Sequence, residues 1–166
     1  TTGPQILIGS SLGGWLMIRT AQERSNRIAG LVGIAAAPDF TETLVWETLT
    51  SEQKQQMEAD GQIALPNPYA LEDVIYPYHL ILDGRNNLVL DRPINLDIPL
   101  TLFQGMADQE VPWQTAIQIA EKWGGRQVDV ILDKQASHRF SEERHLQQIC
   151  AATYRLYAAE AAMRKC

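Results

Sequence analysis

Three side chains in the sequence have the types and spacing that acyl transfer through a serine requires. Ser11 lies in "GSSLG", Asp108 in "GMADQEVPW" and His138 in "KQASHRF". A serine hydroxyl is a weak nucleophile until a base takes its proton, and a histidine base needs an acid to hold its tautomer and orientation. The sequence therefore predicts a serine hydrolase in which Ser11 attacks a carboxylic ester or thioester, His138 moves the proton and Asp108 orients His138.

The spacing of the glycines selects Ser11 over its neighbour Ser10. Gly9 and Gly13 flank Ser11 in a Gly-x-Ser-x-Gly pattern, whereas the same pattern centred on Ser10 would need glycines at positions 8 and 12. The pattern is typical of a strained strand-to-helix turn that lifts the serine hydroxyl clear of a sheet edge. We expect Gly9 and Gly13 to allow close backbone approach in this turn. An ordinary Gly/Ser turn that starts a helix is the alternative.

Apolar runs that end just before each of these side chains predict the elements that position them. We expect strands over residues 5–10, 28–38, 98–105 and 128–134, and helices over residues 12–22, 112–124 and 142–163. Strands that alternate with helices favour an α/β fold with a parallel sheet, here of about four strands. Because the carboxyl ends of parallel strands share one edge, Ser11, Asp108 and His138 should meet there.

Apolar spacing within two of the helices predicts which faces are buried. In the helix over 112–124, Trp113, Ile117 and Ala120 share one face. In the helix over 142–163, the side chains expected to face inward are Leu146, Ile149, Cys150, Tyr154 and Tyr157.

Only His138 among the three histidines follows a predicted strand by a short turn. His79 lies in a proline-rich segment, where we expect it to pack against neighbours. His145 lies within the last helix, where we expect a solvated or capping side chain. A loop histidine that hydrogen-bonds locally is the alternative for His138.

Two aspartates compete for the role of the acid, because both follow a predicted strand. Asp108 follows the third strand and Asp39 the second, while Asp129 and Asp133 lie within the fourth. We favour Asp108. Its alternative role is to start the helix that follows.

The segment 39–97 interrupts the alternation and predicts a helical insertion over the sheet, a lid. Short helices are expected at Thr43–Leu49 and Ser51–Asp60, followed by a stretch broken by prolines. Apolar side chains of the insertion either line an acyl pocket or, more commonly, pack as an ordinary core; they are Leu44, Val45, Trp46, Leu49, Ile63 and Leu65.

The composition of the chain limits the classes of partner and the cellular location that we expect. The 166 residues are 45% hydrophobic and 20% charged, which suits one globular domain over residues 1–166. A net charge of −6 without a basic cluster argues against nucleic acid or an anionic membrane as the main partner.

The longest apolar stretch, residues 28–38, is too short to span a bilayer. Cys150 and Cys166 form neither a metal motif nor a disulfide framework, which favours a reducing, intracellular compartment. The predicted chemistry needs no metal and no cofactor.

Four stretches together resemble the α/β-hydrolases: "PQILIGSSLGGWLM", "VGIAAAPDF", "GMADQEVPW" and "VDVILDKQASHRF". More narrowly, they are similar to the serine esterases that include the mitochondrial palmitoyl-protein thioesterase, also called mycophenolic acid acyl-glucuronide esterase, and its bacterial relatives. The resemblance implies that Ser11, Asp108 and His138 form the catalytic triad in the chain order of this family. It also implies a small-molecule ester or acylated-protein thioester as substrate, and a cytoplasmic location, or a mitochondrial one in a eukaryote.

In this family the backbone N–H after the nucleophile, here Leu12, helps to bind the oxyanion, and a second donor comes from a loop after an earlier strand. The chain opens on Thr1 and reaches a central-type strand at once, so we expect the downstream part of a longer protein, without the N-terminal strands. A non-catalytic binding module or inactive fragment with this fold is the alternative. Haloalkane or epoxide hydrolysis is disfavoured because it uses an aspartate where Ser11 stands.

Overall fold

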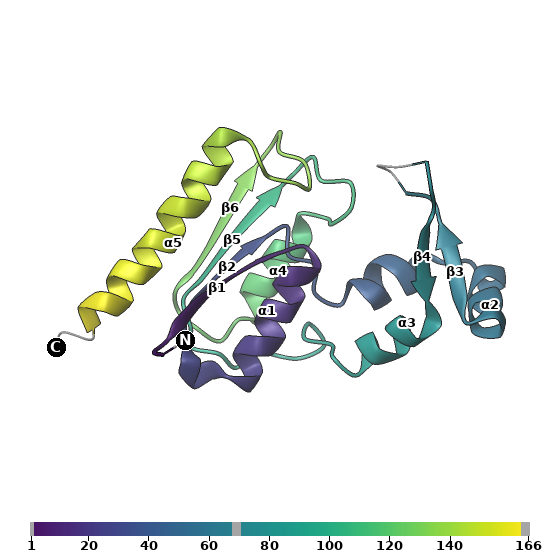
Figure 1. The fold of residues 1–166 in the computed structure, drawn as a ribbon, viewed down its shortest axis with the longest axis horizontal. Coiled ribbons are helices and arrows are strands. Elements are labelled where there is room, and N and C mark those ends of the chain that lie inside the picture. The colour runs from purple at the N-terminus through teal and green to yellow at the C-terminus, as the bar shows by residue number, and fades with distance from the viewer. Residues whose placement is uncertain (1, 68–70, 164–166) are drawn as a thin grey trace. The chain divides into compact units, whose positions relative to one another are not determined.

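A parallel sheet of four strands runs through the computed structural model, which describes residues 2–67 and 71–163 (Figure 1). The strand order is β1 (Gln5–Ser10), β2 (Ile28–Ile34), β5 (Leu100–Gly105) and β6 (Val128–Asp133). The four predicted strands and the α/β fold class are therefore confirmed. β2 ends earlier than expected because the chain turns at Ala35, where φ is 45°. Thr1 and Cys166 lie outside the described residues.

The described chain divides into two compact units, residues 2–38 with 89–163, and residues 39–88. In the first unit α5 (Glu143–Met163) covers one face of the sheet, and α1 (Leu12–Glu23) and α4 (Gln114–Lys122) cover the other (Figure 1). Between α5 and the sheet, the strands, the loop after β6 and α5 itself contribute the buried side chains of Val32, Ile34, Phe103, Ala136, Phe140 and Ala152. None of the helices in residues 2–67 and 71–163 combines the length and apolarity that a bilayer span requires.

The predicted inward face of α5 is wrong for most of its members. Leu146, Tyr154 and Tyr157 are exposed, the last two by 69% and 61%, and Cys150 is exposed as well. Only Ile149 of the five is half-buried against the core. The reason is geometric: α5 packs on β2 and β1, and beyond β1 the described residues supply no strand for the rest of its apolar surface to cover.

The most deeply buried residues of α4 are not those of the predicted apolar face. Ala116 and Ile119 are buried, whereas Trp113, Ile117 and Ala120 are only half-buried.

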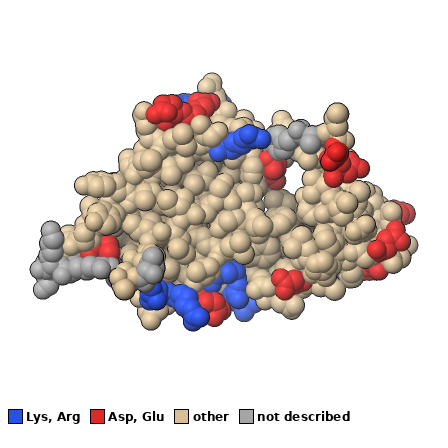
Figure 2. Space-filling model, in the orientation of Figure 1, with Lys and Arg blue, Asp and Glu red and all other residues tan. Residues whose placement is uncertain are grey.

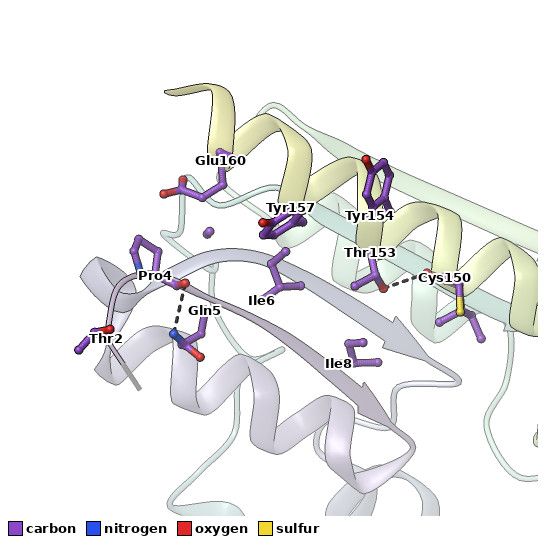
Figure 3. A pocket seen from close by; sticks show the side chains of 13 residues that line it. Thr2, Pro4, Gln5, Ile6, Ile8, Cys150, Thr153, Tyr154, Tyr157 and Glu160 are labelled. Atoms are coloured by element: carbon purple, nitrogen blue, oxygen red, sulfur yellow. Dashed lines mark hydrogen bonds between the residues drawn. The ribbon is translucent and has the colours of Figure 1, made fainter. Parts of the chain in front are cut away.

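An apolar groove of about 870 Å³ runs between β1 and α5. Figure 3 shows Ile6 and Ile8 of β1 on one side of it and Tyr154 and Tyr157 of α5 on the other. Ile8 is 53% exposed. In Figure 2 the surface between α5 and α1 is largely uncharged, and charged side chains lie mainly toward the margins. Beyond β1, the described residues supply no further strand to pair with it.

Residues 1–166 expressed alone are expected to self-associate through the free edge of β1. Unpaired backbone groups along an apolar strand are a template for pairing with another chain, and a charge on such a strand blocks it. Size-exclusion chromatography with light scattering should show oligomers for the unaltered chain and a shift toward monomer for Ile8→Lys. The control is Leu82→Lys, which adds the same charge at a side chain exposed by 44% on the helix α3 (Tyr78–Arg85) and should leave the oligomers in place. A monodisperse unaltered monomer would contradict the expectation.

The second unit contains α2 (Ser51–Asp60), the antiparallel strands β3 (Gln62–Leu65) and β4 (Val74–Pro77), and α3 (Tyr78–Arg85). The helix α2 has its predicted bounds, because Thr50 and Gln53 form a capping box at its start and Gly61 ends it with φ 74°. The helix expected at 43–49 is two shorter helical turns, Thr41–Val45 and Trp46–Thr48. Neither the β3–β4 hairpin nor α3 follows from the sequence pattern.

Most apolar side chains of this unit form its own core. Val45, Leu49 and Ile63 are buried together with Met57 and Ile81, and Trp46 and Leu65 pack against them half-buried. Ordinary packing, the commoner of the two alternatives, therefore describes these residues. Residues 89–97, which the sequence places in the lid, fold with the first unit: the Ile94 backbone bonds to Lys122 and Gly124 beside α4. The role of residues 39–88 as a lid stays a prediction.

Candidate active site

Ser11 occupies a strained backbone conformation between β1 and α1. Its φ is 53° and its ψ is −123°, values that glycine adopts readily and other residues rarely do. Such a conformation costs on the order of 1–3 kcal/mol and persists only where the surroundings hold it. Three backbone hydrogen bonds do so: the Ser11 N–H donates to Ile34 O, and its carbonyl accepts from Gly14 and Ala37.

The glycines of the turn divide their tasks differently from the sequence expectation. A Cβ at Gly9 would collide with the Gly13 backbone, so Gly9 permits the close approach of strand and helix. A Cβ at Gly13 would meet nothing within 4 Å, so the expectation for Gly13 is wrong. Gly14 takes that role instead, because a Cβ there would collide with Ala36 in the loop after β2. The start of α1 is thus packed closely against the end of β1 and the loop after β2.

Two groups at the start of α1 remain available for chemistry. Ser11 makes no side-chain cap bond to the helix, and within residues 2–67 and 71–163 its hydroxyl has no hydrogen-bond partner. The Leu12 N–H, in the first helical turn, has no acceptor in the same part of the chain. The first N–H groups of a helix carry partial positive charge and suit an anionic oxygen.

Asp108 and His138 are joined by a hydrogen bond of 2.9 Å between Oδ2 and Nδ1. The Asp108 side chain is fully buried. Its Oδ2 also accepts from Gln104 Nε2 at 2.9 Å, and its Oδ1 accepts from the N–H groups of Glu110 and Val111 at 2.8 and 3.0 Å. Asp108 does not cap α4, whose N-cap residue is Trp113. The sequence preferred Asp108 to Asp39, and Asp108 is the acid that binds the ring.

These contacts keep Asp108 ionised and make His138 a stronger base. Burial alone would raise the pKa of Asp108, but the hydrogen bonds from His138 and from the Val111 and Glu110 N–H groups lower it below its usual value. The hydrogen bond to Asp108 raises the pKa of His138 against the opposing effect of burial. A carboxylate at Nδ1 selects the tautomer with the proton on Nδ1, which leaves the Nε2 lone pair to act as a base.

The loop after β6 carries His138 across the sheet edge toward β1. Neighbouring strands lie about 4.8 Å apart, so three spacings separate β6 from β1 by roughly 14 Å. The loop crosses the end of β5, where the Ala107 N–H donates to Ala136 O at 3.1 Å. A Cβ at Gly105 would collide with the same carbonyl, so glycine is required there. The described residues contain no hydrogen bond between Ser11 and His138, and such bonds are often long before substrate binds.

A second Asp–His pair, which the sequence analysis did not predict, stabilises the loop after β6. Asp133 Oδ1 accepts from the Gln135 and Ala136 N–H groups, and Oδ2 accepts from His145 Nε2 at 3.0 Å. These bonds lower the pKa of Asp133, and the bond from the Gln135 N–H has the largest effect. His145 is 1% exposed and its ring stacks on Phe140, where φ is 44°.

The expectation of a solvated or capping His145 is therefore wrong. Asp133 lies at the end of β6, as expected, and also binds the loop that follows and His145. The physical reason is that α5 starts beside this loop, so the His145 side of its first turn packs against Phe140 and Asp133, while Glu143, Arg144 and Leu146 stay exposed. The only signal in the sequence was an aspartate at a strand end followed by a short polar turn. His79, expected to pack, is exposed on α3.

The ligand atoms of Asp108, Glu110 and His138 lie within 4.8 Å of one another. Asp108 Oδ2 and His138 Nδ1 are already bound to each other by a hydrogen bond. The geometry as it stands suits proton transfer.

Comparison with known proteins defines the class. The chain has an α/β-hydrolase fold. It superimposes on the solved alpha/beta hydrolase domain-containing protein 10 from mouse with a TM-score of 0.84 and 35% identity, over 96% of this chain and 64% of that one. A putative hydrolase from Agrobacterium vitis S4 gives a TM-score of 0.86 and 32% identity, over 91% and 60% of the two chains.

Among curated proteins, the chain is similar to the mitochondrial palmitoyl-protein thioesterase ABHD10. The Mus musculus protein is 41% identical over 142 residues, which are 85% of this chain and 48% of that protein. The Homo sapiens protein is 39% identical over 146 residues, 87% and 47% of the two. The chain thus spans about half the length of these relatives. No family model matches the chain. The resemblance drawn from the four sequence stretches is confirmed.

Proposed function

We propose that the natural protein is a serine hydrolase that cleaves carboxylic esters or thioesters through an acyl-enzyme on Ser11. The observation that carries the proposal is the 2.9 Å bond between buried Asp108 and His138 Nδ1. It leaves Nε2 as the proton acceptor, at the same sheet edge where Ser11 stands in its strained turn. The similarity to proteins named palmitoyl-protein thioesterase supports the same chemistry.

In the first half-reaction, Ser11 Oγ attacks the acyl carbon while His138 Nε2 takes its proton. The imidazolium that forms faces the Asp108 carboxylate, which stabilises it. The imidazolium then gives its proton to the departing alkoxide or thiolate as the bond between this group and the acyl carbon breaks. In the second half-reaction, water loses a proton to His138 and attacks the acyl-enzyme, which releases the acid and restores Ser11.

Negative charge develops on the acyl oxygen in both half-reactions. The Leu12 N–H at the start of α1 is the donor that we assign to this oxyanion. It makes no hydrogen bond within the described residues, so no partner has to be displaced. Loss of one oxyanion donor costs on the order of 10²- to 10³-fold in rate, so this group is a substantial part of the site.

Acylated-protein thioesters and small-molecule esters such as acyl glucuronides are the proposed substrates. The names of the curated relatives favour the thioesters and support a mitochondrial location over a cytoplasmic one. The net charge of −6 argues against nucleic acid as a partner.

Labelling with a fluorophosphonate tests the proposal, because only an activated serine reacts with this probe. We expect the natural protein to be labelled, and the label to disappear in Ser11→Ala and to remain in Ser10→Ala. A folded protein that takes no label at all would instead support the alternative of a non-catalytic binding module with this fold.

A further inference from the structure

A carboxylate lies beside the nitrogen that transfers the proton. Glu110 Oε2 is 3.8 Å from His138 Nε2. The Glu110 side chain is 34% exposed, and that of His138 is 13% exposed. The Glu110 N–H donates to Asp108 Oδ1, so the Glu110 backbone is held in the loop that carries Asp108. Within residues 2–67 and 71–163, the carboxylates that act on the His138 ring are Asp108 at Nδ1 and Glu110 at Nε2.

We propose that Glu110 is a specificity-determining residue, which disfavours leaving groups with a negative charge two or three bonds from the leaving atom, nearer than the carboxylate of a glucuronate, and favours neutral or cationic ones. This inference rests on the proposed function. It concerns the product that leaves first, the alcohol or thiol, and makes no use of the acyl chain.

The position of the leaving group follows from proton transfer. Asp108 occupies Nδ1, so the leaving atom must receive its proton from Nε2. Proton transfer needs this atom within about 3 Å of Nε2. A charge two or three bonds from the leaving atom then lies roughly 7 Å from the Glu110 carboxylate, which is inside the screening length of about 8 Å at physiological salt.

The expected size of the effect follows from Coulomb's law. At an effective dielectric constant between that of a protein surface and water, one unit charge at this distance changes the rate constant by about tenfold. The same carboxylate helps to raise the pKa of His138, after the larger effect of Asp108. It therefore stabilises the imidazolium while it repels an anionic product.

The test uses three thioesters with one acyl group, hexanoyl, and different thiols. These are thioglycolate, 2-mercaptoethanol and thiocholine, with charges of −1, 0 and +1 at neutral pH. In each, Ser11 Oγ replaces the thiol on the acyl carbon, and the sulfur leaves with the proton from His138. A thiol-reactive dye follows release. We expect kcat/KM of the natural protein to rise from the thioglycolate to the thiocholine ester.

Glu110→Gln should reduce the ratio of kcat/KM for the thiocholine ester to that for the thioglycolate ester by at least about fivefold. Glu110→Asp keeps the charge and should keep most of the ratio. Asp129→Asn removes the same charge at the start of β6, the end of that strand away from His138, and should change nothing. With the unaltered protein, the preference should shrink between about 0.05 and 1 M salt, which needs no variant.

The outcomes separate the two proposals. If all three esters are hydrolysed and Ser11→Ala abolishes this, but the ratio is the same in Glu110→Gln and insensitive to salt, the role of Glu110 is overturned and the hydrolase remains. If Ser11→Ala leaves hydrolysis intact, or no ester is hydrolysed, the proposed function fails and the inference fails with it.

Discussion

Asp108→Asn is expected to lower kcat by about 10⁴-fold, by comparison with the same change in the protease triad. Oδ1 accepts two backbone N–H groups, from Glu110 and Val111, and an asparagine can keep these bonds only with its carbonyl oxygen in that place. Its NH₂ group then takes the place of Oδ2. There it faces His138 Nδ1 and the Gln104 Nε2 donor.

The imidazole can accept from this NH₂ group only by moving its proton to Nε2. In that tautomer His138 can no longer take the proton of Ser11. Steady-state kinetics with an activated ester measures the loss, and circular dichroism verifies the fold. Asp39→Asn should retain most of the activity. The opposite pattern, a large loss at Asp39 and a small one at Asp108, would move the role of the acid to Asp39.

Ser11→Ala is expected to lower kcat by at least about 10³-fold and to leave stability almost unchanged. The hydroxyl makes no hydrogen bond within the described residues, and alanine has the same difficulty as serine at φ 53°. Ser10→Ala should have a far smaller effect on activity. Equal losses of activity in the two variants would show that the turn has been assigned to the wrong serine.

Ser11→Gly separates backbone strain from chemistry. It should abolish activity as alanine does, yet raise the free energy of unfolding by on the order of 1 kcal/mol, because glycine adopts this conformation without strain. Thermal unfolding of the three proteins measures the difference. A glycine variant that is less stable than the alanine variant would mean that the surroundings do not impose the strain.

Local patterns were sufficient for the elements that carry the site. Strands over 5–10, 98–105 and 128–134 could be predicted because continuous apolar runs and turn residues are adjacent in sequence. The same holds for α2, whose capping residues Thr50 and Gln53 stand three positions apart. The β3–β4 hairpin was missed because its strands have only four residues each and lie near prolines, so neither shows a clear alternation.

Residue types and chain order by themselves determined the parallel sheet and the candidates Ser11, Asp108 and His138, because each follows the carboxyl end of a strand. Only the tertiary structure decided what surrounds them. The bond from His145 to Asp133 and the approach of Glu110 to His138 Nε2 join separate loops and elements, and the exposed face of α5 depends on how far the sheet extends beneath it. Burial and partner choice of this kind arise from packing between distant segments, which no periodicity within one segment records.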